Sequence, residues 1–249
     1  MKFSLITATY NSAATLATCI ASVQDQTHPD IEHIIIDGAS KDNTLEVIRS
    51  MPNRVSKIVS EPDKGIYDAM NKGIGLASGE LVGILNSDDL LCDPEALAKV
   101  VRVFEADPSL DAVYADLYYV DQQDTNKIVR RWTSGEKKPF SKGWHPAHPT
   151  LYLKKSVYNA YGLFNLDLKL AADFEIMLRF LEKHRIKTHY LPERFVKMRL
   201  GGATNKSLGN IYKQNIECIK AFRVNNLPVN PVLYPFYRIV PKLFQYKDE

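Results

Sequence analysis

Cysteines and long apolar runs are the scarcest features of this sequence. The three cysteines, Cys19, Cys92 and Cys218, lie far apart and do not have the close spacing of zinc ligands. They fit a chain whose thiols stay reduced, as in the cytosol. No apolar run is long enough to span a bilayer, and the chain enters a short predicted strand without a signal-type stretch. We therefore expect a cytoplasmic protein.

Repeats, low-complexity segments and a dinucleotide-binding glycine motif are also missing. The glycines from Gly73 to Gly79 look superficially like such a motif, but their spacing is wrong and they precede a strand instead of following one. A length of 249 residues is enough for one domain with appendages. The net charge of +3 is uneven, because residues 206–249 hold seven Lys or Arg against three acids. Basic segments of this kind attract phosphates or anionic lipid, although most are simply solvated surface.

Short apolar runs alternate with amphipathic helical patterns over the first 110 residues. This alternation predicts an α/β fold in which a Rossmann-like, mostly parallel sheet is flanked by helices. A helix is expected just after Asp93, an N-cap residue that is followed by Pro94. The predicted strands of this half span residues 3–8, 31–36, 55–59 and 79–85.

The regular alternation stops after residue 110. Strands predicted at 112–120 and 127–132 are joined by a polar turn, which indicates an antiparallel or mixed extension of the sheet. Two more strands are predicted at 186–191 and 195–200. The last helix is predicted to place four residues on one apolar face, namely Tyr212, Ile216, Ile219 and Phe222.

Two adjacent carboxylates, Asp88 and Asp89, follow the apolar run 79–85. Ligands of open α/β sheets bind outside the carboxyl ends of strands, so we expect both side chains on a solvent-facing loop at the functional site. Paired hard oxygen ligands suit Mg²⁺ or Mn²⁺, with substrate phosphates completing the coordination shell. The alternative interpretation is an Asx-type turn from Asn86 to Asp89 that caps the next helix.

Other motifs fall in a fixed order around this acidic pair. They are Ala8-Thr9-Tyr10-Asn11, Asp37 with Ser40 and Asp42, Gly65 to Asn71, His148-Pro149-Thr150, Gly162-Leu163-Phe164 and Ala172 to Arg179. With these motifs the sequence resembles the family 2 glycosyltransferases, which have the GT-A fold and occur in bacterial surface polysaccharide biosynthesis. The resemblance implies a GT-A domain over 1–205, with a nucleotide-sugar-binding half at 1–110 and an acceptor half at 111–205. Residues 206–249 would form a helical and aromatic C-terminal extension.

The resemblance also implies roles for the matching residues. Asp88 and Asp89 would be the acidic metal motif, with Asp89 the more direct ligand and Asp88 nearer the ribose. Asp173 would be the catalytic base, and Glu175 on the same predicted helix is its rival. The residues expected to contact the nucleotide-sugar are Ala8, Thr9, Tyr10, Asn11, Asp37, Lys64, Asn71, Asn86 and Asp88.

The activity implied by the resemblance is inverting, metal-dependent sugar transfer from a nucleotide-diphosphate sugar. Mn²⁺ or Mg²⁺ would be the cofactor, a UDP-sugar is the first expected donor, and the acceptor would be a glycan or a lipid-linked glycan. No nucleic-acid partner is expected. A non-catalytic nucleotide-sugar-binding module and a sugar nucleotidyltransferase are the alternatives, but the sequence lacks the glycine- and arginine-rich phosphate loop expected of the latter.

Two segments are open to two interpretations each. His145 and His148 are too few ligands for a structural zinc site, so they either pack within a loop or contact acceptor or phosphate. Residues 227–246 interleave aromatic and apolar residues with two basic ones, and their four prolines argue against a spanning helix. This tail either makes peripheral contact with the inner face of the cell membrane or folds back over the helix of residues 205–225.

Overall fold

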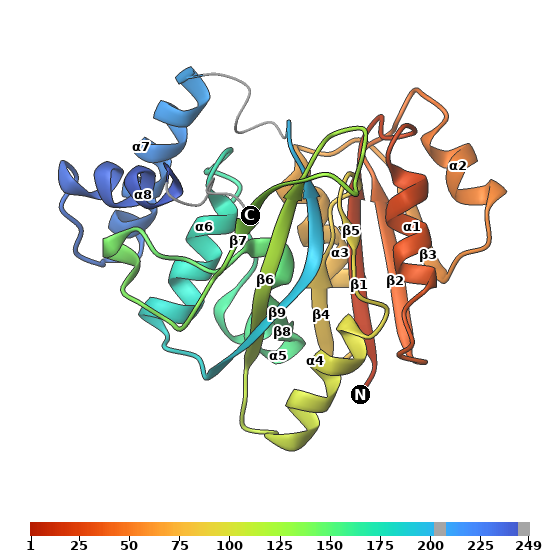
Figure 1. Cartoon of the computed structure of the whole chain (residues 1–249), viewed down its shortest axis with the longest axis horizontal. Helices are drawn as coiled ribbons and strands as arrows, with labels where there is room; N and C mark the ends of the chain where they lie inside the picture. The colour runs from red at the N-terminus through yellow and green to blue at the C-terminus, as the bar shows by residue number, and fades with distance from the viewer. Residues whose placement is uncertain (202–207, 244–249) are drawn as a thin grey trace.

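The structure, a computed structural model, describes residues 1–201 and 208–243 (Figure 1). The strands are β1 (Phe3–Thr9), β2 (Ile31–Asp37), β3 (Val55–Ser60), β4 (Leu81–Ile84), β5 (Leu90–Leu91), β6 (Ala112–Val120), β7 (Ile128–Trp132), β8 (Tyr152–Lys154) and β9 (Thr188–Arg199). The α-helices are α1 (Leu16–Gln24), α2 (Thr44–Ser50), α3 (Ile66–Leu76), α4 (Ala96–Ala106), α5 (Lys155–Tyr161), α6 (Ala172–Met177), α7 (Leu208–Val224) and α8 (Leu233–Leu243). Short helical turns are η1 (Phe140–Lys142), η2 (His148–Thr150) and η3 (Leu178–Lys183), the last being a π-helical continuation of α6.

Nine strands of the described residues form one mixed sheet, in the order β3-β2-β1-β4-β8-β6-β9-β5 with β7 paired to β6. β1 pairs in parallel with β2 and β4, and β2 pairs in parallel with β3. These four strands confirm the predicted parallel half and bring the carboxyl ends of β1, β2 and β4 to one edge. β7 and β8 run antiparallel to β6, which confirms the mixed extension.

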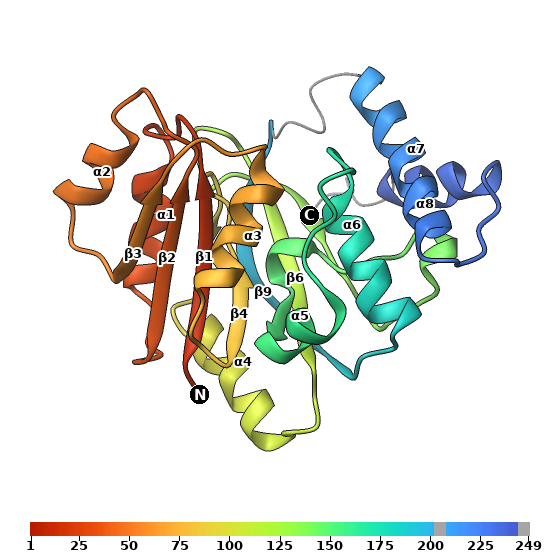
Figure 2. The same ribbon diagram turned by 180° about the vertical axis from the view of Figure 1, so that it is seen from behind.

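Helices cover both faces of the sheet and enclose two apolar cores. α1 and α4 lie in front of the sheet in Figure 1, with α2 at the β3 edge, whereas α3 and α5 lie in front of it in the reverse view of Figure 2. Leu16, Ile20 and Leu97 belong to the first core, and Met70 and Ile74 belong to the second. Both faces of β1 are therefore buried, including the polar residues Ser4 and Thr7 that interrupt its apolar sequence.

Glycine at position 73 lets α3 approach the sheet closely. A Cβ atom at Gly73 would lie 2.4 Å from Cγ2 of Ile6 on β1, which is closer than two carbon atoms can come without displacement. Gly73 lies inside the helix, which ends at Leu76, near the predicted position.

Two predicted boundaries are wrong. α4 begins at Ala96, because the Asp93 side chain accepts the Glu95 amide at 2.8 Å in a turn that precedes the helix. One continuous strand, β9, replaces the two strands predicted at 186–191 and 195–200. β9 stays paired with β6 on both sides of Pro192, which has no amide hydrogen and falls where the register with β6 shifts.

α7 of the C-terminal extension lies beside α6 (Figure 2), and aromatic rings form the contact. The Phe222 ring of α7 lies 5.8 Å from Phe174 and 5.2 Å from Tyr234 of α8. The predicted apolar face of α7 is only partly correct, because Tyr212 is 68% exposed and Ile216 is 48% exposed. The face that meets α6 lies further around the helix and carries Cys218, Ala221 and Phe222. The expected domain boundary at residue 205 lies outside the described residues and stays a prediction.

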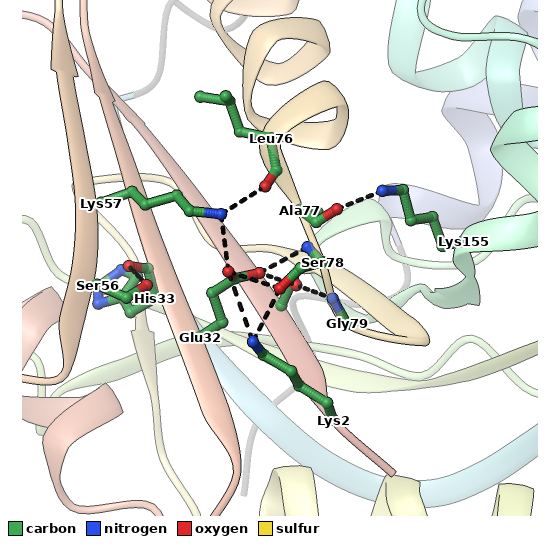
Figure 3. A network of polar contacts seen from close by, with 11 residues as sticks. Lys2, Glu32, His33, Ser56, Lys57, Leu76, Ala77, Ser78, Gly79 and Lys155 are labelled. Carbon is green, nitrogen blue, oxygen red and sulfur yellow. Dashed lines mark hydrogen bonds and ion pairs between the residues drawn. The ribbon is translucent and has the colours of Figure 1, made fainter.

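A buried carboxylate ties together the amino-terminal ends of the parallel strands, opposite the functional edge (Figure 3). Glu32 of β2 accepts hydrogen bonds from the Ser4 hydroxyl at 2.6 Å and from the Ser78 amide at 2.7 Å. Lys57 of β3 donates to it at 3.0 Å, and Lys2 lies 3.7 Å away. Burial alone would raise the pKa of Glu32, but these hydrogen bonds outweigh it and lower the pKa from 4.5 to about 2.

Glu32→Gln should therefore lower the free energy of unfolding by about 3 kcal/mol at pH 7, without changing ligand binding at the opposite edge. Because the pKa is lower in the folded state, this contribution is complete above pH 4.5 and disappears as the pH falls toward 2. Urea unfolding of both proteins at several pH values measures it. The control is Glu95→Gln, since Glu95 and Arg102 form an exposed ion pair that should contribute little. A difference between wild type and Glu32→Gln that does not shrink in acid would contradict the prediction.

Candidate active site

The acidic motif follows β4 at the carboxyl edge of the sheet. The Leu85 amide still donates to the Ile6 carbonyl of β1, and the chain then turns, with the Asp89 amide donating to the Asn86 carbonyl at 3.0 Å. The Asn86 side-chain amide donates back to Asp89 Oδ2 at 3.0 Å. The chain therefore makes a backbone turn here and not the Asx-type turn of the alternative interpretation, because Asn86 Oδ1 accepts no hydrogen bond. The Asn86 side-chain amide fixes the orientation of the Asp89 carboxylate.

Asp89 is 1% exposed, so the expectation that both acids face solvent is wrong for this residue. Asp89 is buried because the last residue of β9, Arg199, packs against the acidic motif. The Arg199 amide donates to Asp89 Oδ1 at 3.3 Å, and its guanidinium donates to the Asp88 carbonyl and to Thr18 Oγ1. Asp88 is only half-buried.

The charges of this motif are incompletely balanced within the protein. Burial raises the pKa of Asp88, and burial together with the Asp88 charge raises the pKa of Asp89 well above its usual range; the Arg199 charge opposes both effects. Asn86 Oδ1 is also buried without a hydrogen-bond partner. These hard oxygen atoms fit a divalent cation. Because no group of three or more His, Cys, Asp or Glu suited to a metal occurs in the described part of the chain, diphosphate or water would have to supply further ligands.

The loop after β1 is tied to the loop after β2. The Asn11 amide donates to Ser40 Oγ at 2.8 Å, and the Lys41 amide donates to Asn11 Oδ1 at 2.9 Å. Asn11 itself has a positive φ of 49°, which asparagine tolerates better than most residues. Tyr10 stands exposed on this surface. The structure therefore brings the predicted nucleoside-binding segments side by side.

Asp37, Ala8 and Thr9 lie beneath this surface rather than on it. Asp37 is fully buried and accepts the Ser40 amide at 3.0 Å and the Ser60 hydroxyl at 2.6 Å. Ala8 and Thr9 are the last residues of β1 and are both buried. These residues shape the loops, and contact between Asp37 and a base or ribose stays a prediction.

Lys64 has an exposed side chain, whereas the side chain of Asn71 is hydrogen-bonded within the protein. Lys64 is exposed on the loop before α3. Its neighbour Asp63 packs closely against Gly38, since a Cβ atom at Gly38 would lie 2.5 Å from Asp63 Oδ2. Lys64 is therefore near the nucleoside-binding loops. Asn71 is engaged at both ends of its side-chain amide by the Phe164 backbone, at 3.0 and 2.9 Å. Asn71 therefore ties α3 to the segment after α5, and its expected contact with the donor stays a prediction.

A pocket at the carboxyl edge brings the acidic motif and Asp173 together. Asp173, at the start of α6, accepts the Tyr67 hydroxyl of α3 at 3.2 Å and the Phe174 amide at 2.8 Å. His148 also lies there, and burial lowers its pKa while the Asp173 charge opposes the shift. The pocket is lined by Ile66, Tyr67, Met70, Asn86, Asp88, Asp89, His148, Pro149, Lys169, Leu170, Asp173, Met198 and Arg199.

Glu175 does not line this pocket. It is buried and pairs with Arg179, whose Nε and Nη2 donate to its two oxygens at 3.0 and 3.1 Å. Asn225 of the C-terminal extension also donates to Glu175, at 2.9 Å. Asp173, and not its rival, therefore lines the same pocket as Asp88.

Tyr67 and Arg199 line the pocket although the sequence did not single them out, and the role of His148 had two interpretations. Tyr67 lies inside the Gly65 to Asn71 motif, which could have indicated it. Arg199 has no local signal, because β9 approaches the acidic motif only through folding. Of the two histidines, His148 lines the pocket, whereas His145 packs with Trp132 at 5.1 Å between ring centres.

A comparison with protein-family models identifies the family of this chain. The model described as glycosyl transferase family 2 matches residues 4–162. The chain belongs to glycosyl transferase family 2. A glycosyltransferase of PGL/p-HBAD biosynthesis from Mycobacterium tuberculosis is 32% identical over 196 residues, which cover 76% of this chain and 73% of that protein. The chain is therefore a glycosyltransferase, as its motifs predict.

Solved structures of GT-A glycosyltransferases share its fold. The structure of S. aureus TarS 1–349 in complex with UDP-GlcNAc has a TM-score of 0.67 and 18% identity, covering 96% of this chain and 70% of that one. In a longer TarS structure the chain spans 44% of the length. The mannosyltransferase PcManGT from Pyrobaculum calidifontis, in complex with GDP-Man and Mn²⁺, has a TM-score of 0.65 and 18% identity, covering 95% of this chain and 68% of that one. The predicted GT-A fold is confirmed.

Proposed function

We propose that this protein is an inverting, metal-dependent glycosyltransferase that uses a nucleotide-diphosphate sugar. One observation carries the proposal: a single pocket holds the Asp88 and Asp89 pair from the end of β4 and Asp173 from the start of α6. An acidic pair suited to a cation and a separate carboxylate suited to a base are the two parts that direct displacement needs.

Asp88 and Asp89 would hold Mn²⁺ or Mg²⁺, which supplies neutralisation of charge on the leaving diphosphate. Asp173 takes the proton of the acceptor hydroxyl as its oxygen bonds to the anomeric carbon. The bond from that carbon to the diphosphate oxygen breaks at the same time, and its electron pair leaves with the diphosphate. Attack from the face opposite the leaving group inverts the anomeric configuration, and no covalent enzyme intermediate forms. The Tyr67 hydroxyl holds the Asp173 carboxylate in place.

Two solved complexes support a nucleotide-sugar donor, since TarS was solved with UDP-GlcNAc and PcManGT with GDP-Man and Mn²⁺. A thermal-shift screen of UDP-glucose, UDP-N-acetylglucosamine, GDP-mannose and dTDP-rhamnose tests the class of donor. We expect at least one donor, with a UDP-sugar first, to raise Tm more in the presence of Mn²⁺ than with EDTA. Stabilisation that is identical with and without the metal would contradict the metal-dependent part of the proposal.

The acceptor is proposed to be a glycan or lipid-linked glycan reached at the inner face of a membrane. No helix in the described residues is long and apolar enough to span a bilayer. α8, however, turns its polar Arg238 inward, where it donates to Asn215 at 3.2 Å, and turns apolar side chains outward. The exposed apolar ridge consists of Leu233, Phe236, Ile239 and Val240.

Exposed lysines lie beside this apolar ridge and favour anionic lipid as its partner. Lys142 of η1 lies 4.8 Å from the centre of the Tyr237 ring, and Lys138 is exposed just before η1. Each basic side chain near an anionic surface contributes roughly 1 kcal/mol of attraction. Tyr234 is nevertheless fully buried against Phe222, so α8 packs back on the protein with one side and exposes the apolar ridge on the other. Deleting it would disturb the core, and point variants are the better test.

Phe236→Ser combined with Val240→Ser should lower co-sedimentation with phosphatidylglycerol vesicles at low salt by several-fold. Both side chains are exposed to water in the free protein and would be buried only on binding to the bilayer. Lys138→Gln with Lys142→Gln should weaken vesicle binding at low salt and make the remaining binding less sensitive to salt. The control is Leu76→Ser, an exposed apolar residue at the end of α3. A wild-type protein that ignores the vesicles would refute the membrane assignment. A concentration-dependent dimer that Phe236→Ser dissociates would assign the ridge to a second copy instead.

A further inference from the structure

The segment that carries Asp173 is held by the C-terminal extension. The Glu217 carboxylate of α7 accepts three successive backbone amides, those of residues 169–171, at 3.2, 2.7 and 3.0 Å. Gln214, one turn earlier on α7, donates to the Leu170 carbonyl at 3.2 Å. Two side chains on one face of α7 thus fix the backbone immediately before α6.

Residues near the start of α6 supply no such support themselves. Ala171 occupies the N-cap position and has no side chain that can accept a hydrogen bond. Glu217 instead accepts the amides of residues 169–171, so it fixes the segment that leads into the helix. Hydrogen bonds to an ionised carboxylate are stronger than those between neutral groups, so three of them hold this segment firmly.

We propose that Glu217 is a positioning residue for Asp173, so that the extension completes the active site. The inference rests on the proposed role of Asp173 as the base. Asp173 stands two residues after Ala171, and Lys169 and Leu170 line the same pocket. The backbone position of the base is therefore set by α7, while the Tyr67 hydroxyl orients its carboxylate. A displacement of about 1 Å at such a group can cost a hundredfold in rate.

Glu217→Gln is the direct test. The new side-chain amide can turn only one oxygen toward the three backbone amides, so at least part of the clamp is lost. We expect turnover, measured as nucleoside diphosphate release from the best donor of the panel above, to fall about ten- to a hundredfold. The dissociation constant of that donor should stay unchanged, because its proposed contacts lie on the loops after β1, β2 and β4.

Asn225→Ala is the matched control. It removes a buried hydrogen bond to Glu175 at the same junction between α6 and α7. We expect it to lower Tm at least as much as Glu217→Gln while keeping normal turnover well below Tm. Equal loss of turnover in both variants would show a merely structural role.

A double-mutant cycle with Asp173→Asn separates this inference from the proposed function. If Glu217 acts through Asp173, Glu217→Gln should cause no further loss of turnover in the Asp173→Asn background. Additive losses would overturn the positioning role. An inactive Asp173→Asn with a fully active Glu217→Gln would refute this inference alone, whereas an active Asp173→Asn would refute both.

Discussion

Asp173→Asn should lower turnover on the order of a hundredfold or more while leaving donor affinity unchanged. Asparagine keeps the size of the side chain and an oxygen that can accept the Tyr67 hydroxyl, but it cannot take a proton from the acceptor. The rate of nucleoside diphosphate release and the donor dissociation constant, measured on the same preparation, separate the two effects.

Glu175→Gln is the control for that experiment and should behave in the opposite way. Glu175 is occupied by Arg179 and Asn225, so its replacement should lower Tm and leave turnover near normal at a temperature well below Tm. Near-normal turnover by Asp173→Asn, together with an inactive Glu175→Gln, would transfer the role of base to Glu175.

Asp88→Asn and Asp89→Asn should each remove the gain in donor affinity that Mn²⁺ provides. Either change takes one negative charge from the pair, and a neutral amide is a much poorer ligand for a hard cation. We expect manganese to strengthen donor binding at least about tenfold in the wild type, which is ~1.4 kcal/mol, and to have little effect in the variants. Calorimetric titration of the donor with Mn²⁺ and with EDTA measures the difference.

The fold should survive both substitutions, because the buried Asp89 carboxylate and the half-buried Asp88 carboxylate lie close together and their negative charges destabilise the metal-free protein. Tm without metal should therefore stay the same or rise. Asp30→Asn serves as a control at an exposed position next to β2. Unchanged manganese-dependent affinity in both test variants would reject the metal assignment.

Local patterns were sufficient to predict the parallel half of the sheet. β4 is a short apolar run followed by polar residues, the pattern that burial on both faces favours. β1 and β2 are mostly apolar but also bury polar residues such as Thr7 and His33. The short strands β5 and β8 carry no such signal. The two residues of β5 and the three of β8 become strands only because β9, β4 and β6 offer free backbone groups beside them.

Site residues were predictable by type and order, but their surroundings were not. The burial of Asp89 follows from Arg199, which is more than a hundred residues away in the chain. The engagement of Asn71 follows from the Phe164 backbone, which no local pattern reveals. The same holds for Glu217, because its three hydrogen bonds exist only once α7 packs beside α6. Contacts of this kind depend on tertiary packing, which helical or strand periodicity does not encode.

The most direct measurement is the reaction itself, followed by proton NMR with the best donor of the panel, with Mn²⁺ or with EDTA. We predict manganese-dependent release of nucleoside diphosphate and a first-formed sugar product of inverted anomeric configuration. Release of sugar 1-phosphate together with a nucleoside monophosphate would instead indicate attack at phosphorus, as in nucleotidyl chemistry. Donor binding with no turnover would indicate a binding module. A first-formed product with retained configuration would contradict the single displacement in which Asp173 is the base.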